Sequence, residues 1–324
     1  MSNMSGNRYS ILYILGRGRS GSTVIDAVLG NLGSTFGTGE LVEGLHRRYP
    51  DGICSCGAVL AECPIWGTVV REAEASLELP HEEWARVLAT QMHLKSFPKT
   101  LISGRSSKWS SNLWSINDAL YTAVSKATGC QYVVDSSKEM TRAYFILKHF
   151  SEAKGLHLVR NPHGFISSYY QRILKGGDFK LVRFQLGGAI RRYPVIKYPG
   201  LAILALSWLI GNLYAEFLKI LFRERVLFIR YDDFCIDPVG QTALIAKHMG
   251  HPFDELEAKM SSGEDLITGH KAAGNEWTSK KATFTFDASV NRKHRLPWLV
   301  HWITSAICFP LILKYKFSFK WEKE

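Results

Sequence analysis

The feature that most constrains the fold is the stretch GRGRSGST, residues 16–23, which lies between the apolar run ILYIL and the segment VIDAVLGNLG. Gly16 and Gly21 are five positions apart and hydroxyl residues follow, which is the spacing of a phosphate-binding loop between a strand and a helix. Ser22 stands where such a loop has its lysine. Backbone N–H groups and the helix N-terminus still converge on one anion. The residues expected to hold that anion are Arg17, Gly18, Arg19, Ser20, Gly21, Ser22 and Thr23. The alternative is a glycine-rich turn without a ligand.

Four short apolar runs predict the strands of one sheet. They are residues 11–15, 132–135, 156–160 and 226–230. Each is almost continuously apolar, as expected for a strand that is buried on both faces. Helix signals follow them, for example Asn161-Pro162 after the third run. This alternation predicts an α/β fold in which helices flank a parallel sheet in three layers, with ligands at the carboxyl ends of the strands.

Length and composition predict one domain spanning residues 1–324, since 46% of the residues are hydrophobic and a full core can form. The segments at about 60–130 and 170–222 have a mainly helical pattern, and we interpret them as insertions that shape an acceptor cleft. Residues 296–324 form an apolar tail. We expect it to pack on the domain or to lie on a membrane surface, because Pro310 would kink a spanning helix.

Charge and targeting signals limit the partners and the compartment. The formal net charge of +11 favours an anionic partner, such as a phosphorylated cofactor, an acidic glycan or a membrane surface. The first ten residues lack the apolar core of a secretion signal. Six cysteines are too few and too unevenly spread for a disulfide scaffold of this length. We therefore expect a cytoplasmic protein with reduced thiols.

Two motifs carry a resemblance to a known family. RSGST after an apolar strand resembles the 5′-phosphosulfate loop of the sulfotransferases that use 3′-phosphoadenosine 5′-phosphosulfate, particularly the bacterial and carbohydrate-type branch. In LVRNPHGFISSYYQR, residues 158–172, Arg160 ends a strand and Ser168 follows eight residues later. In the family this pair holds the 3′-phosphate of the nucleotide, a group for which an arginine fork is well suited.

A third and looser match is GHKAAGNEW, residues 269–277, which resembles the family's mobile loop over the nucleotide. The matching positions are Lys271, Gly274 and Asn275. In the family a basic residue commonly follows the Gly-Asn pair closely. Here Glu276 and Trp277 follow, and Lys280 or Lys281 could substitute.

The resemblance implies transfer of a sulfuryl group from 3′-phosphoadenosine 5′-phosphosulfate to a hydroxyl or amine, without a metal. Such transfer needs positioning and charge stabilisation. Glu40 resembles the catalytic glutamate of the tyrosylprotein branch, as a base or to orient the hydroxyl, with Glu43 as second choice and a solvated acid as the alternative. Arg19 and Lys138 would supply the cations. The preferred acceptor is a glycan or glycolipid.

The sequence CSCGAVLAEC contains Cys54, Cys56 and Cys63, a spacing that raises the possibility of zinc. Three cysteines lack a fourth ligand nearby, and His46 or His81 would have to complete the site. Free or loosely paired thiols in a lid loop are the preferred interpretation.

Two other functions remain open from the residues. Asp135 at the end of the second run, with Thr23, would suit the magnesium site of an ATP-dependent small-molecule kinase. The missing loop lysine and the Arg160/Ser168 pair argue against it. A non-enzymatic alternative, which we favour less, is a basic surface that binds nucleic acid or a membrane. Its residues are Arg183, Phe184, Arg191, Arg192, Tyr193, Lys197 and Tyr198.

Overall fold

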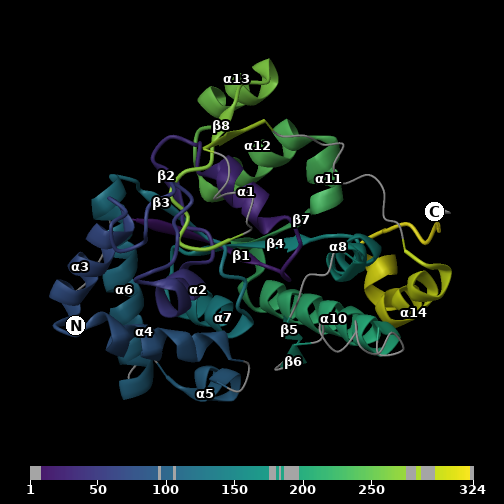
Figure 1. The fold of residues 1–324 in the computed structure, drawn as a ribbon, viewed down its shortest axis with the longest axis horizontal. Helices are drawn as coiled ribbons and strands as arrows, with labels where there is room; N and C mark the ends of the chain where they lie inside the picture. Colours follow the sequence, from purple (N-terminus) through teal and green to yellow (C-terminus); the bar gives the residue numbers. More distant parts are fainter. Residues whose placement is uncertain are drawn as a thin grey trace.

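A five-stranded parallel sheet forms the centre of the computed structural model (Figure 1). Its strand order is β2-β3-β1-β4-β7. The strands are β1 (Ser10–Leu15), β2 (Thr35–Gly37), β3 (Tyr132–Asp135), β4 (Lys154–Val159) and β7 (Val226–Arg230). The structure describes residues 9–93, 96–104, 107–174, 180–181, 184–185, 197–274, 282–285 and 296–321.

The predicted α/β fold is confirmed, and the four predicted strands correspond to β1, β3, β4 and β7. β2 is an additional edge strand of three residues, too short to give a periodic signal in the sequence. In the register of β1, Tyr13 lies opposite Asp135 of β3 and Leu15 opposite His157 of β4. All five strands run in the same direction, so their carboxyl ends share one edge of the sheet.

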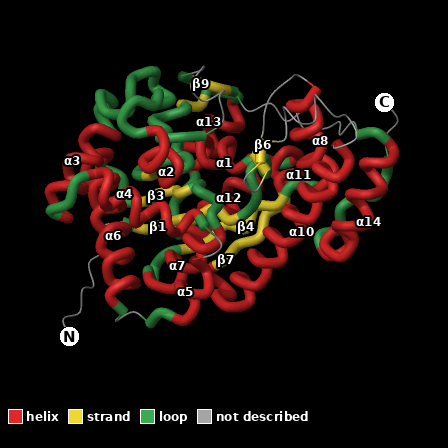
Figure 2. The backbone as a smooth tube through the Cα atoms, turned by 60° about the horizontal axis from the view of Figure 1, so that its bottom comes forward, coloured by secondary structure: helices red, strands yellow, loops and turns green. Residues whose placement is uncertain are grey.

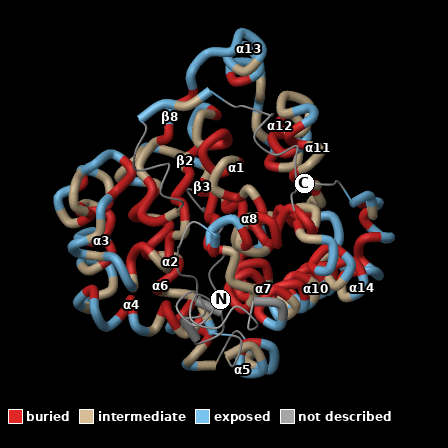
Figure 3. The backbone as a smooth tube through the Cα atoms, turned by 45° about the vertical axis from the view of Figure 1, so that its right-hand side comes forward, coloured by how far each residue is buried: buried red, intermediate tan, exposed pale blue. Residues whose placement is uncertain are grey.

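The side chains of β1 explain why the sheet lies between two layers of helices. Leu12 and Ile14 belong to the core on the side of α1 (Ser22–Leu29) and α12 (Pro238–Met249). Ile11 and Tyr13 belong to the core on the side of α6 (Lys108–Thr128), α7 (Met140–His149) and α10 (Lys197–Phe222). Successive strand residues point to opposite faces. Figure 2 shows the strands enclosed by helices, and Figure 3 shows that buried segments gather around them.

Helices fill most of the two predicted insertions. Between β2 and β3 lie α2 (Leu41–Glu43), a π-helical turn η1 (Gly44–Arg48), α3 (Trp66–Leu77), α4 (His81–Ala89), η2 (Thr90–Met92), α5 (Phe97–Ile102) and α6. Between β4 and β7 lie α8 (Pro162–Leu174), β5 (Lys180–Leu181), β6 (Phe184–Gln185), α10 and η5 (Arg223–Arg225). The β5-β6 hairpin was not expected in a helical segment, and two residues per strand give no pattern to detect.

After β7 the chain forms α11 (Tyr231–Ile236), α12, α13 (Asp254–Ser262), β8 (Leu266–Ile267), β9 (Thr283–Phe284) and α14 (Trp298–Lys314). Within the described residues, α10 is the one helix with the length and composition to cross a membrane, and half of its most apolar window is buried inside the protein. A core helix of a soluble protein has the same properties. Leu204 and Trp208 of α10 pack with Val300 of α14 in one cluster, and α14 is shorter and contains Pro310.

Candidate functional site

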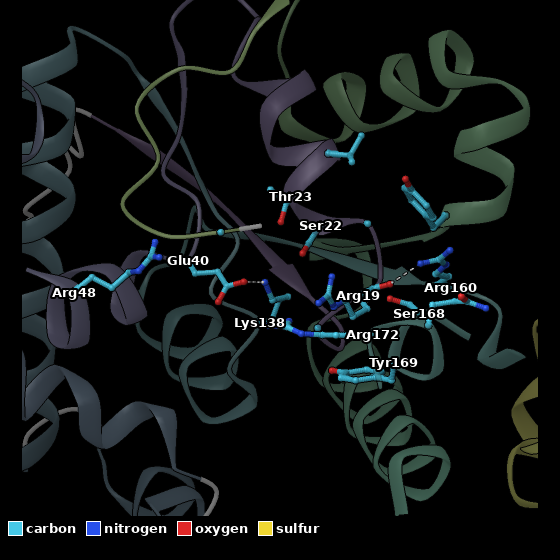
Figure 4. Close-up of a pocket in the computed structure, with 16 residues that line it drawn as sticks. Arg19, Ser22, Thr23, Glu40, Arg48, Lys138, Arg160, Ser168, Tyr169 and Arg172 are labelled. Atoms are coloured by element: carbon cyan, nitrogen blue, oxygen red, sulfur yellow. Dashed lines mark hydrogen bonds and ion pairs between the residues drawn. The ribbon is translucent and has the colours of Figure 1, made fainter. Parts of the chain in front are cut away.

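One cavity of about 870 Å³ lies at the carboxyl edge of the sheet (Figure 4). Every strand contributes a lining residue shortly after its last residue. These residues are Glu40 after β2, Lys138 after β3, Gly18 and Arg19 after β1, Arg160 after β4 and Tyr231 after β7. The remaining lining residues are Gly21, Ser22, Thr23, Val24, Arg48, Ser168, Tyr169, Gln171, Arg172 and Gly274.

The glycine-rich loop reaches the cavity through a left-handed backbone turn. Gly21 is the N-cap of α1 with φ 93°, and a β-carbon there would overlap the ring of Tyr231. Glycine is therefore required both by the backbone conformation and by the space. Among the residues that the structure describes, no side chain caps the N-terminus of α1. Its first N–H groups are thus available to an anion beside the lining residues Ser22 and Thr23.

Arg160 brings the second predicted phosphate element into the same cavity. Its Nη1 donates a hydrogen bond to the backbone oxygen of Arg19 at 3.2 Å. Asn161 Oδ1 accepts from the N–H of His163, so the capping of α8 predicted from Asn161-Pro162 is present and places Ser168 beside Arg160 (Figure 4). Burial lowers the pKa of Arg160. A bound anion would offset the cost of burying this cation.

Glu40 and Lys138 form an ion pair at the other end of the cavity. Lys138 Nζ donates to Glu40 Oε1 at 2.6 Å. The backbone N–H of Glu40 donates to Ala273 O at 2.9 Å. Neighbouring Glu139 is not a lining residue, although burial raises its pKa to about 7. Of these two acids, Glu40 is therefore the one placed to meet a ligand.

Three residues predicted to bind the cofactor do not line the cavity. Arg17 packs against Gly211 of α10, and Ser20 is buried. Lys271 is also buried, where it pairs with Asp26 and donates to Gly37 O at 2.9 Å. Because this ammonium is used within the core, we do not assign Lys271 to the cofactor.

Gly274 lies at the cavity as predicted from the third motif, whereas Asn275 lies outside the described residues. The side chains of the predicted basic surface at 183–198 also lie outside them.

Several lining residues were not predicted. Tyr169, Gln171 and Arg172 lie on α8 close to Ser168, and helical spacing from Ser168 could have indicated Arg172. Arg48 ends the π-helical turn η1. No local sequence signal indicates Arg48, because its position depends on how the chain turns after β2.

The charges at the site favour an anionic ligand. Among the described lining residues there is one carboxylate, Glu40. The cations are Arg19, Arg48, Lys138, Arg160 and Arg172. Low-dielectric walls around clustered cations concentrate the attraction for an anion.

Asp135 cannot serve as the magnesium ligand that a kinase would need. It is fully buried, its carboxylate is paired with Arg142 at 2.9 Å, and it accepts from Tyr121 Oη at 2.7 Å.

Comparison with protein families matches the sulfotransferase family over residues 12–255. Comparison with curated proteins finds no match. Among solved structures, the chain is similar to the sulfotransferase domain of an olefin synthase from Synechococcus, with 18% identity, 96% of this chain and 97% of that chain covered and a TM-score of 0.49. It is also similar to a sulfotransferase from Mycobacterium avium, with 13% identity, 97% and 79% covered and a TM-score of 0.49. A third is a sulfotransferase from Alicyclobacillus acidocaldarius, with 14% identity, 94% and 93% covered and a TM-score of 0.47.

The family match covers more than half of the chain and includes both phosphate motifs, residues 16–23 and 158–172. This chain therefore belongs to the sulfotransferase family and is a transferase.

Proposed function

We propose that the protein transfers a sulfuryl group from 3′-phosphoadenosine 5′-phosphosulfate to a hydroxyl or amine of an acceptor. The observation that carries this proposal is the meeting of two separate phosphate elements in one cavity. The loop at Arg19 and the α8 element at Arg160 line the same cavity and are joined by a hydrogen bond of 3.2 Å. A nucleotide that carries phosphates on both the 3′ and the 5′ oxygen of its ribose would place one phosphate at each element.

The strand order supports one direction for the proposed donor. Along the sheet edge, Arg160 follows β4, Arg19 follows the neighbouring β1, and Lys138 follows β3 on the other side. Figure 4 shows the same sequence of side chains across the site. Arg160 and Ser168 would thus hold the 3′-phosphate, and the loop would hold the phosphosulfate. The acceptor would enter beside Glu40.

The donor supplies an activated sulfuryl group, which leaves the phosphate as the acceptor oxygen or nitrogen bonds to sulfur. Glu40 orients the acceptor hydroxyl and accepts its proton. Arg19 and Lys138 stabilise the negative charge that develops on the oxygen between phosphate and sulfur. Lys138 also fixes the position of the Glu40 carboxylate through their ion pair.

For the acceptor we propose a glycan or glycolipid, and for the location the cytoplasm, at a membrane surface. The support for membrane association is two exposed apolar stripes at helical spacing. They are Ile203, Leu206, Ile210, Leu213, Phe217 and Ile220 on α10, and Trp298, Trp302, Phe309 and Leu313 on α14. Each stripe is outside the cluster in which the two helices pack on each other. Exposed apolar stripes on a chain with a formal net charge of +11 suit the interface of an anionic bilayer.

Nucleotide titration tests the donor. We expect adenosine 3′,5′-bisphosphate to bind without magnesium and to protect the protein from thermal unfolding. ATP with magnesium serves as the comparison, since a kinase would bind it preferentially. Binding of ATP that depends on magnesium, with no binding of the bisphosphate, would contradict the proposal.

The variant Glu40→Gln tests the role of the carboxylate. It keeps the shape of the side chain but removes the proton acceptor, so turnover should fall by about 10² to 10⁴ while the affinity for adenosine 3′,5′-bisphosphate is retained. Transfer from isotopically labelled donor to lysate glycolipids provides the activity measurement. Glu43→Gln is the matched control, because Glu43 pairs with exposed Arg47 outside the lining. Normal turnover in Glu40→Gln would remove Glu40 from the mechanism.

A further inference from the structure

Four potential metal ligands come together in a cluster whose members do not line the cavity. They are Cys54, Cys56, Cys63 and His270, and their ligand atoms all lie within 4.8 Å of one another. His270 Nδ1 is 3.3 Å from Cys63 Sγ and 3.9 Å from Cys54 Sγ. Cys63 Sγ is 3.6 Å from Cys54 Sγ and 3.9 Å from Cys56 Sγ. Two of the thiols are fully buried.

The four distances of 3.3–3.9 Å are close to the edges of a zinc-centred tetrahedron. Zinc–sulfur bonds of about 2.3 Å and zinc–nitrogen bonds of about 2.0 Å give sulfur–sulfur edges of about 3.8 Å and sulfur–nitrogen edges of about 3.5 Å. A disulfide would instead require two sulfur atoms about 2.05 Å apart. Since three thiols and an imidazole converge rather than one pair of thiols, the arrangement fits a metal better than a single disulfide.

The geometry points to a structural Zn²⁺ site formed by Cys54, Cys56, Cys63 and His270. Three sulfur ligands and one nitrogen are a common set for structural zinc, and four protein ligands leave no position for substrate. Zinc binds the deprotonated thiol and the neutral imidazole. A zinc ion would stabilise the thiolates in this buried position.

The fourth ligand is His270, and neither His46 nor His81, the histidines considered from the sequence, belongs to the cluster. His81 Nε2 donates to Leu45 O at 2.7 Å and is used elsewhere. His270 is 207 residues from Cys63 in the sequence. Hydrogen bonds between the segment at Ser55 and the segment 269–271 bring it to the cysteines. The N–H of Lys271 donates to Ser55 Oγ at 2.6 Å, and Ser55 Oγ donates to Gly269 O at 2.5 Å. This pairing would position His270 before any metal binds.

The zinc would fix the chain segment that supports the cavity. After His270, residue Ala273 pairs with Gly39 in a β-bridge and accepts a hydrogen bond from the N–H of Glu40. Gly274 then lines the cavity. A metal that joins the cysteine loop to His270 would therefore hold the segment 270–274 against the backbone of Glu40. Its role would be positioning, with no contact to the reacting groups.

Metal analysis of the full chain tests this site independently of sulfuryl transfer. The protein is purified under reducing conditions without chelator, and zinc is measured by mass spectrometry. We expect one zinc per chain, and near-complete loss in Cys56→Ala and His270→Ala, which change the two more exposed ligands. The matched controls are Cys130→Ala and Cys308→Ala, whose cysteines lie outside the cluster. They should retain zinc.

Two further measurements test the zinc site even if Cys56→Ala or His270→Ala folds poorly. His270→Cys provides a fourth thiolate and should retain zinc. Cobalt replacement in the wild type should give the intense visible bands of a tetrahedral site and sulfur-to-cobalt charge transfer. A wild type that stays metal-free after reconstitution with zinc, or a disulfide between two of these cysteines in the protein purified under reducing conditions, would overturn the proposal. So would equal zinc loss in the Cys130 control.

Discussion

At the scale of single residues, Arg160 makes two contacts that organise the site. Its guanidinium joins the α8 element to the backbone of Arg19, and it lies over the ring of Tyr231 with 5.8 Å between the guanidinium carbon and the ring centroid. Burial of a cation costs free energy, which is why burial lowers the pKa of Arg160. An anionic ligand would offset that cost, so we expect a change at Arg160 to weaken binding of the proposed 3′-phosphate.

We expect Arg160→Ala to weaken binding of adenosine 3′,5′-bisphosphate by about 1 to 3 kcal/mol through lost charged hydrogen bonds. Binding of adenosine 5′-monophosphate should change much less, because it has no 3′-phosphate. Isothermal titration of both nucleotides measures the difference. Arg47→Ala is the control, since Arg47 is exposed and pairs with Glu43 away from the cavity. An equal loss for both nucleotides would argue against the assigned role.

At the scale of elements, the β-bridge between Gly39 and Ala273 holds the Glu40 end of the cavity in place. Gly39 has φ 73°, and a β-carbon there would meet the carbonyl oxygen of Ala273. The next residue is Glu40, whose N–H bonds to the same carbonyl. The side chain of Glu40 is thus positioned by a contact between segments that lie far apart in the sequence.

Comparison of Gly39→Ala with Gly129→Ala distinguishes the effect of backbone strain from the effect of disturbing the contact between Gly39 and Ala273. Both glycines have positive φ, at 73° and 70°, but a β-carbon at Gly129 meets open space. Gly129→Ala should lose about 1 kcal/mol of stability from the left-handed backbone, and Gly39→Ala should lose more, because its β-carbon also overlaps Ala273 O. Only Gly39→Ala should also lower turnover, since Ala273 must shift. Urea unfolding and the transfer assay provide the measurements, and equal turnover in the two variants would contradict the idea.

A second element-scale feature is a buried polar contact between β4 and α10. His157 of β4 is fully buried and contacts Asn212 Oδ1 through Nε2 at 3.1 Å. Glu216 lies 3.9 Å from its Nδ1, and Glu216 in turn pairs with Lys314 of α14 at 2.6 Å. Burial lowers the pKa of His157 to about 4. The contact therefore links strand and helix while His157 stays neutral.

This shift makes stability depend on pH. The unfolded histidine titrates near 6.5, so between about pH 6.5 and pH 4 the unfolded state binds a proton that the folded state does not, and stability falls as the pH decreases. From pH 7.5 to pH 5 the contribution of His157 is a loss of about 2 kcal/mol. His157→Gln should remove that part of the loss. Urea unfolding of both proteins at the two pH values tests it, and parallel losses would contradict the assigned shift.

At the scale of the whole molecule, net charge and exposed apolar surface act together. The chain carries a formal charge of +11. The exposed stripe of α14 begins with Trp298, which is 58% exposed, and Trp302, which is 46% exposed. Tryptophan prefers the interfacial region of a bilayer. We therefore expect attraction by charge, followed by shallow insertion of these rings.

Vesicle flotation checks the membrane proposal. Vesicles containing phosphatidylglycerol should bind the protein and shift its tryptophan fluorescence to the blue, whereas pure phosphatidylcholine should bind it weakly. The double variant Trp298→Ala, Trp302→Ala should bind less, with nucleotide affinity unchanged. Leu101→Ala serves as the control, since Leu101 is an exposed apolar residue on α5. Equal binding of the double variant and the wild type would rule out α14 as the contact.

The sequence by itself determined the features that depend on neighbouring residues. Continuous apolar runs predicted four of the five strands of the central sheet, and the spacing of Gly16 and Gly21 predicted the turn between β1 and α1, because these signals come from local backbone chemistry. Arg160 and Ser168 could be chosen because they share one strand-to-helix turn. The parallel direction of the strands then placed both motifs at one edge.

Only the tertiary structure decided which polar groups meet across long sequence separations. It paired Lys271 with Asp26 inside the core, brought Arg48 to the cavity, and placed His270 among three cysteines. None of these contacts has a local signal, since each depends on how loops far apart in the chain cross the sheet edge. The sequence does not distinguish a charged side chain that faces a ligand from one that pairs with a buried partner. The difference depends on where the folded chain buries that side chain.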